Sequence, residues 1–123
     1  MKKVLVIEDN ENNMELINFL LTSHDYEVLQ AFRGQDGIDL ALKHKPDLIL
    51  LDIQLPDIDG TVVLDNLRQT AEVAKVPIIA VTSYAMTGDS KKLLDAGCDG
   101  YIEKPIDPDR FIDQVDTVLQ SRS

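Results

Sequence analysis

Five short apolar runs alternate with segments of helical periodicity, and this alternation predicts an α/β domain built on a parallel sheet. Three of the runs are unbroken, as in strands that are covered on both faces, so we expect them at the centre of the sheet. The other two are shorter and flanked by polar residues, which favours the edges. With right-handed crossovers, the pattern predicts a doubly wound, flavodoxin-like sheet of strand order 2-1-3-4-5. The expected strands are Val4–Ile7, Val28–Ala31, Leu48–Leu51, Ile78–Val81 and Tyr101–Ile102.

Apolar residues recur at helical spacing after the first strand and again near the end of the chain. Asp107 and Pro108 fit the N-cap and the first position of the last helix. Gly97 is expected to end the helix before the last strand, because glycine readily adopts the left-handed conformation found at helix ends. The apolar positions are Met14, Ile17, Leu20 and Leu21 in the first helix, Leu93, Leu94 and Ala96 before Gly97, and Phe111, Val115, Val118 and Leu119 in the last helix.

The length of 123 residues is ordinary for one domain, and we expect residues 1–123 to fold as a unit. Its 12 Lys and Arg residues against 22 Asp and Glu residues leave a net charge of -10, which opposes direct binding to nucleic acid or to an anionic membrane. Only four apolar residues stand between Lys3 and Glu8, too few for a signal peptide or a membrane span. A cytoplasmic location is therefore expected.

Polar side chains follow the apolar runs at the points where the strands are expected to end. In doubly wound sheets, ligands bind beyond the carboxyl ends of the strands. Three carboxylates, a hydroxyl pair and an amine converge on this edge: Glu8 and Asp9 after the first run, Asp52 after the third, Thr82 and Ser83 after the fourth, and Lys104 after the fifth.

Three crowded carboxylates repel one another, so a cation is expected among them. Oxygen ligands with room for water favour Mg²⁺. A carboxylate held beside Mg²⁺ and an ammonium group is a competent nucleophile toward a phosphoryl group, because both cations neutralise charge on the transferring oxygens. We therefore expect Asp52 to react, with Lys104 beside it and Thr82 donating its hydroxyl to a phosphoryl oxygen.

The same residues resemble the receiver domains of two-component response regulators, and the resemblance covers the whole chain. Its finer stretches are similar to free-standing cell-cycle receivers and to receivers attached to hybrid histidine kinases. The resemblance implies that Asp52 accepts a phosphoryl group from the phosphohistidine of a histidine kinase or a histidine phosphotransfer protein. The matching stretches are IEDNENNM, LDIQLP, VTSYAM and GCDGYIEKPI.

The resemblance also implies a role for each neighbour of Asp52. Asp9, Asp52 and the main-chain carbonyl of Gln54 would bind Mg²⁺, with Glu8 acting directly or through water. Lys104, in a cis bond to Pro105, would contact the phosphoryl oxygens.

Thr82 and Tyr101 would form a switch, in which the hydroxyl moves to the phosphate and the ring turns inward. Ser83 stands where Ala is common in the family, and Tyr84 is expected to overhang the phosphoryl group and slow its loss to water. Such a protein assists its own phosphorylation and dephosphorylation rather than acting as an enzyme, and signals by binding a downstream protein.

Two other classes of function compete with this interpretation. The stretch DIDGTV, from Asp57, resembles the first motif of haloacid-dehalogenase-like phosphatases, but in that family a strand runs directly into the first Asp. Here Pro56 precedes Asp57, and we expect Asp57 and Asp59 to shape a loop in which Asp57 is less constrained than Asp52 at the end of its strand. A binding scaffold that is never phosphorylated would be expected to lack part of the acid, threonine and lysine set, which is complete here.

Overall fold

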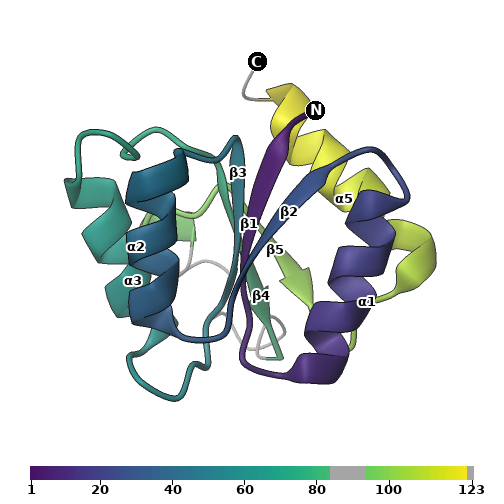
Figure 1. Cartoon of the computed structure of the whole chain (residues 1–123), viewed down its shortest axis with the longest axis horizontal. Coiled ribbons are helices and arrows are strands. Elements are labelled where there is room, and N and C mark those ends of the chain that lie inside the picture. The colour runs from purple at the N-terminus through teal and green to yellow at the C-terminus, as the bar shows by residue number, and fades with distance from the viewer. Residues whose placement is uncertain (84–93, 122–123) are drawn as a thin grey trace.

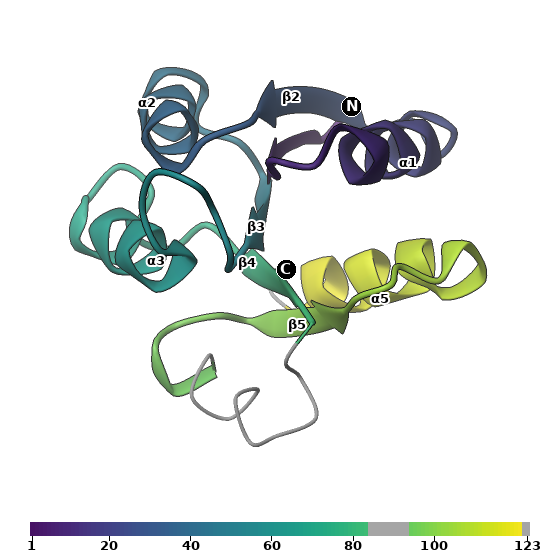
Figure 2. The same cartoon turned by 90° about the horizontal axis from the view of Figure 1, so that it is seen from below.

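The computed structural model describes residues 1–83 and 94–121, and its five parallel strands form one sheet in the order β2-β1-β3-β4-β5, as predicted. Helices α2 and α3 cover one face of the sheet, and α1 and α5 cover the other (Figures 1 and 2). No helix in the described ranges is long and apolar enough to cross a membrane. The strands are Lys3–Ile7, Glu27–Ala31, Leu48–Asp52, Ile78–Thr82 and Gly100–Glu103, and the helices α1, α2, α3 and α5 are Glu11–Thr22, Gly34–His44, Gly60–Gln69 and Pro108–Ser121.

The strands are longer than the apolar runs that predict them. β3 and β4 continue to Asp52 and Thr82, because Asp52 still pairs with Val81 in the ladder. The expectation of short edge strands is right for β5, which has four residues. It is wrong for β2, which has five, because Glu27 pairs with Lys3 although its side chain is polar and exposed. The two reactive candidates Asp52 and Thr82 thus lie within strands and not in loops.

The core consists of two layers that share the sheet. Side chains of a strand alternate between its faces, so β1 and β3 contribute to both layers. Leu5 and Leu51 pack toward α2 and α3, whereas Val4 and Leu50 pack toward α1 and α5, and all four are fully buried. Burying each such side chain stabilises the fold by about 1.5–3 kcal/mol. The central strands β1 and β3 are therefore held from both sides up to their carboxyl ends.

Helix ends follow the predicted signals. The Asp107 carboxylate accepts the main-chain N–H of Asp109 at 3.0 Å just before Pro108, the first residue of α5. Gly97 has a φ of 118° and donates its N–H to the carbonyl of Leu94, as expected at a helix end. Leu93, which we also expect in that helix, lies outside the described residues.

A partly buried ion pair fixes the amino ends of β4 and β5. The guanidinium of Arg68 on α3 lies 2.8 Å from the carboxylate of Asp99, which also accepts the N–H of Ile78 at 2.9 Å. Arg68 further donates to the carbonyls of Ala74, Val76 and Gly97. We call Arg68, Asp99 and these carbonyls the amino-end ion pair.

A second polar contact joins distant parts of the chain. The hydroxyl of Tyr26, just before β2, donates to the carboxylate of Asp116 on α5 at 2.5 Å. Burial and this carboxylate raise the pKa of Tyr26, so the phenol keeps its proton. The contact ties the start of β2 to the last helix across the α1 face of the sheet.

Candidate functional site

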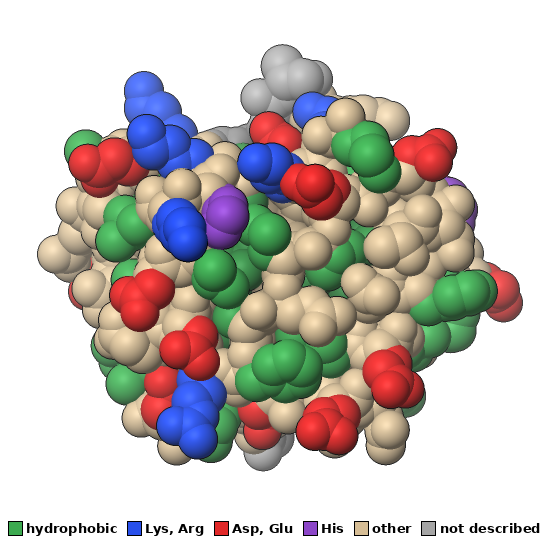
Figure 3. All heavy atoms as spheres, in the orientation of Figure 1, with side chains coloured by type: hydrophobic (Ala, Val, Ile, Leu, Met, Phe, Trp, Pro, Cys, Tyr) green, Lys and Arg blue, Asp and Glu red, His purple; other side chains and the backbone are tan. Residues whose placement is uncertain are grey.

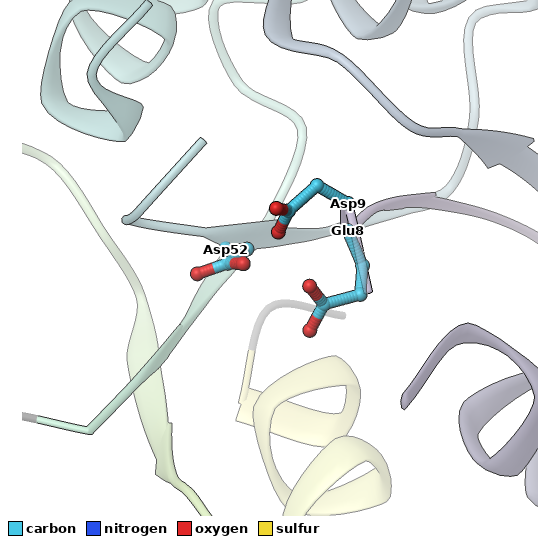
Figure 4. Close-up of side chains that lie close together, drawn as sticks. All are labelled: Glu8, Asp9 and Asp52. Carbon is cyan, nitrogen blue, oxygen red and sulfur yellow. The ribbon is translucent and has the colours of Figure 1, made fainter. Parts of the chain in front are cut away.

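The central strands bring three carboxylates together. β1 and β3 pair side by side with Ile7 opposite Leu51, so Glu8 and Asp9 emerge next to Asp52. Carboxylate oxygens of all three lie within 4.8 Å of one another, and the side chains face a common space (Figure 4). Glu8 and Asp52 are each only 2% exposed, whereas Asp9 is open to solvent. The predicted convergence of acids at this edge is confirmed.

Lys104 supplies the positive charge at this edge. It follows β5, and its N–H donates to the carbonyl of Thr82 at 2.9 Å, which holds the chain beside β4. Its ammonium nitrogen lies 3.1 Å from Glu8 Oε1 and 3.2 Å from Asp52 Oδ2. We call Glu8, Asp9, Asp52 and Lys104 the carboxyl-end cluster. One ammonium therefore serves two buried carboxylates, and a third carboxylate lies within reach.

Crowding of like charge shifts the ionisation of this cluster. Burial, together with the hydrogen bond and the charge of Glu8, raises the pKa of Asp52 to about 7. Burial also acts to raise the pKa of Glu8, but hydrogen bonds from Asp52 and the Asn10 N–H and the charge of Lys104 outweigh it, and the pKa is lowered. For Lys104 burial is outweighed by Asp52 and Glu8, and the pKa is raised. Without a further cation, Asp52 is the group that keeps a proton near neutral pH.

The donor set of this cluster fits Mg²⁺. Carboxylate oxygens are the hard ligands that this ion prefers, and the exposed side of Asp9 leaves room for the water molecules that it retains. On the face drawn in Figure 3, Lys and Arg gather toward the amino ends of the strands, while Asp and Glu dominate the opposite half. The acidic half of this face attracts cations.

Of the other predicted residues, Gln54 and Thr82 lie beside Asp52, and Ser83 follows Thr82 at the surface. The N–H of Gln54 donates to Asp52 Oδ1 at 2.9 Å, so its peptide adjoins the reactive carboxylate. Thr82 is 1% exposed at the end of β4, the strand next to Asp52, and Ser83 beside it is exposed. Tyr84 falls outside the described residues.

Tyr101 lies apart from the acids, on the edge strand β5, with 41% of its surface exposed. It lines a cleft with Lys104, the following Pro105 and Arg110 of α5. The bond between Lys104 and Pro105 is cis, as expected. Lys104 thus belongs to the carboxyl-end cluster and also lines the cleft.

Asp57 is held more firmly than its position after Pro56 predicts. Its two carboxylate oxygens accept the N–H groups of Gly34 and Gln35, at 2.8 and 3.0 Å. These bonds, from Gln35 and then Gly34, lower the pKa of Asp57. The sequence does not predict these partners, because they come from a helix more than 20 residues away in the chain. The one sequence hint lies at α2 and not beside Asp57: its N-cap residue Arg33 is not among the residue types that cap helices, and it makes no side-chain capping bond.

Comparison with known proteins agrees with this geometry. The family model of the response regulator receiver domain matches residues 4–116. The polar-differentiation response regulator DivK of Brucella anthropi is 43% identical over 118 residues, which cover 96% of both chains. The expected resemblance to free-standing receivers of this kind is thereby confirmed.

Solved structures with the same fold include a putative response regulator and the receiver domain of a histidine kinase. A putative response regulator from Chloroflexus aurantiacus J-10-fl superposes with a TM-score of 0.91 at 26% identity, covering 97% of this chain and 98% of that one. The receiver domain of the sensor histidine kinase PA1611 from Pseudomonas aeruginosa PAO1, described with a magnesium ion in its active site cleft, gives a TM-score of 0.84 at 32% identity and covers 98% and 95%. Fold, acid cluster and sequence likeness agree, and the chain belongs to the response regulator receiver domain family.

Proposed function

We propose that this chain is a single-domain response regulator, formed by residues 1–123, that accepts a phosphoryl group on Asp52. The observation that carries the proposal is the buried Asp52 carboxylate at the end of β3, 3.2 Å from the Lys104 ammonium and grouped with two further acids. The donor is a phosphohistidine on a histidine kinase or histidine phosphotransfer protein. In the transfer, an Asp52 oxygen forms a bond to phosphorus, the bond between phosphorus and the imidazole nitrogen breaks, and the imidazole leaves with that electron pair.

The cluster supplies the positive charge that this transfer needs. Asp9, Asp52 and the main-chain carbonyl of Gln54 would hold Mg²⁺, with Glu8 acting directly or through water. When bound, the ion neutralises charge on the phosphoryl oxygens. Lys104 would contact the same oxygens, and its ammonium, 3.2 Å from Asp52 Oδ2, supports this role. Asp52 must be ionised to attack, and a second cation beside it favours that form.

The signal would pass from Asp52 to the edge of the sheet. Thr82 would move its hydroxyl to a phosphoryl oxygen, and the exposed ring of Tyr101 on the neighbouring strand would turn inward. Ser83 adjoins Thr82, and the prediction that Tyr84 shields the phosphoryl group remains. The reshaped surface would bind a downstream protein, in a cytoplasmic protein that assists its own phosphorylation and dephosphorylation. The net charge of -10 argues against nucleic acid as the direct target.

The competing phosphatase interpretation requires Asp57 as the nucleophile. Both oxygens of Asp57 are occupied by main-chain N–H groups of α2, and Asp59 caps α3 through the N–H of Thr61 at 2.9 Å. Neither residue belongs to the acid group around Asp52. These contacts give Asp57 and Asp59 structural roles and favour Asp52.

Labelling with acetyl phosphate and Mg²⁺ tests the proposal. The wild type should gain one acid-stable, hydroxylamine-labile phosphoryl group, and chelation of the metal should prevent it. Asp52→Asn should abolish the label, because an amide is a poor nucleophile and a weaker metal ligand. Asp57→Asn should retain it at saturating Mg²⁺. Thr82→Ala should still take up the label but lose the change in NMR shifts at Tyr101.

Each alternative predicts a different result in this experiment. Label that survives in Asp52→Asn and is lost in Asp57→Asn would assign the chain a phosphatase-like chemistry. A wild type that takes no label from acetyl phosphate or from any phosphorylated histidine partner would favour the alternative of a binding scaffold that is never phosphorylated.

A further inference from the structure

The loop between β3 and α3, residues 53–59, reaches across to the start of helix α2. At its tip the Asp57 carboxylate accepts two successive N–H groups of the first turn of α2, those of Gly34 and Gln35. These N–H groups have no partner within their own helix, and the N-cap residue Arg33 makes no side-chain capping bond. Asp57 therefore caps α2 from a separate loop, with both oxygens in use.

Close packing accompanies this contact. A Cβ atom at Gly34 would lie 2.5 Å from the Ile58 side chain, so glycine is what lets the loop tip approach α2. At the base of the loop, the N–H of Gly60 donates to the carbonyl of Ile53 at 2.9 Å, and a Cβ atom there would lie 2.5 Å from the Ile53 Cα atom. The loop is thus fixed at its base by Gly60 and at its tip by Asp57 and Ile58.

The segment between these two anchors contains Gln54. Its N–H donates to Asp52 Oδ1, and its carbonyl is a proposed Mg²⁺ ligand. The Gln54 side chain itself is exposed, so the path of the loop decides where this peptide lies. Whatever anchors the tip limits how far the peptide can move away from Asp52.

We propose that Asp57 is a positioning residue, which holds the loop of residues 53–59 against α2 and thereby keeps the Gln54 peptide beside Asp52 for metal binding. Asp57 touches neither the metal nor the phosphoryl group. The part that concerns Mg²⁺ rests on the proposed function, whereas the anchoring of the loop does not.

Three variants separate this role from plain capping of α2. Asp57→Ala removes both acceptors, and Asp57→Asn keeps one carbonyl oxygen in place. Asp36→Ala is the matched control: Asp36 is an exposed acid in the first turn of α2, and its loss removes the same charge near the same helix end. In the described part of the chain, the Asp36 side chain makes no hydrogen bond to the loop.

Amide hydrogen exchange in metal-free protein is the first measurement. Asp57→Ala should speed exchange at Gln54 and Gly60 in the loop as well as at Gly34 and Gln35. Asp36→Ala should affect at most the first turn of α2. If Asp57→Ala speeds exchange only in α2, Asp57 is a cap alone and the proposal is overturned.

Mg²⁺ titration, followed by NMR shifts of the loop amides, is the second measurement. Asp57→Ala should weaken Mg²⁺ binding roughly threefold to tenfold, since outer residues of metal sites have effects of this order or larger. Asp57→Asn should lie between Asp57→Ala and the wild type, and Asp36→Ala should match the wild type. Equal weakening by Asp57→Ala and Asp36→Ala would mean that only charge matters, which contradicts positioning.

The two measurements also separate failure of this inference from failure of the proposed function. A wild type that shows no Mg²⁺ binding would reject the metal site and with it the proposed effect on binding. The exchange data would still decide whether Asp57 anchors the loop.

Discussion

Each end of the sheet holds a partly buried cation beside carboxylates, but the two ends are balanced differently. In the amino-end ion pair, Arg68 faces one carboxylate, and three main-chain carbonyls accept its remaining N–H groups. In the carboxyl-end cluster, Lys104 faces two carboxylates that are almost fully buried, with a third nearby. The first arrangement is complete in itself, while the second has an excess of negative charge.

The contrast separates structural charges from functional ones. A buried ion pair stabilises a fold only when its hydrogen bonds are satisfied, as those of Arg68 are. Burial and excess negative charge both cost stability, and the raised pKa of Asp52 reflects both. A cation bound beside these carboxylates would reduce that cost. The position of charged residues alone would not distinguish the two ends, but their charge balance does.

Arg68→Ala should give the largest effect, because it leaves the partly buried Asp99 carboxylate without its cation and removes the Arg68 donors of three main-chain carbonyls. We expect the free energy of unfolding to fall by about 3 kcal/mol. Urea denaturation at neutral pH measures it, with Arg110→Ala, an exposed arginine on α5, as the control. A loss no larger than that of the control would mean that the amino-end ion pair is not structural.

Asp52→Asn should have the opposite sign and raise the free energy of unfolding by about 1–2 kcal/mol at pH 8 without Mg²⁺. The folded-state pKa of Asp52, about 7, lies above the ordinary value of 3.8. The stability that this group contributes is therefore fully present below pH 3.8 and lost as the pH rises through 7. The neutral amide avoids that loss.

Urea denaturation at pH 8 and pH 4 tests the sign of this effect. The gain in Asp52→Asn should shrink toward pH 4, where Asp52 keeps its proton in the folded state. Asp99→Asn, in the balanced pair, should lower stability at pH 8. A loss of stability in Asp52→Asn at pH 8 would contradict the idea that the carboxyl-end cluster carries a destabilising excess of negative charge.

Mg²⁺ affinity should depend on pH, and this is the smallest of the three effects. The metal needs the ionised carboxylate, so binding should tighten about tenfold from pH 6 to pH 8 as the Asp52 proton is lost. Calorimetry in two buffers of different ionisation enthalpy should detect proton release near pH 7. In Glu8→Gln, which removes the neighbouring charge, the midpoint should move to lower pH. A midpoint unchanged from that of the wild type would show that Glu8 does not raise the pKa of Asp52.

Most of the fold and the acid cluster could be predicted from the sequence, because both follow from local patterns. Unbroken apolar runs mark central strands, and parallel strands bring their carboxyl ends together. Strand order and the group of Glu8, Asp9 and Asp52 followed from these two rules. Strand ends were missed by a residue or two, since ladder pairing continues into polar residues such as Glu27.

The remaining contacts are tertiary and leave little trace in local sequence. Asp57 follows a proline in a loop, and nothing next to it indicates that its partners are Gly34 and Gln35. Arg68 and Asp99 are 31 residues apart, and each alone is typical of an exposed surface charge. Only the folded chain shows that Arg68 and Asp99 balance each other and that Asp57 anchors a loop.

The two-layer core has a consequence for synthesis of the chain. As the polypeptide leaves the ribosome, nearly all buried residues of the layer under α2 and α3 have been made by Ala80, and among the described residues Cys98 completes it. The layer under α1 lacks Phe111 and Val115 of α5 until the end of the chain emerges. Val4 and Val6 of β1 belong to this layer, which is therefore completed later than the other. A nascent chain is most exposed to misassociation on this face, and α5 is the element that closes it.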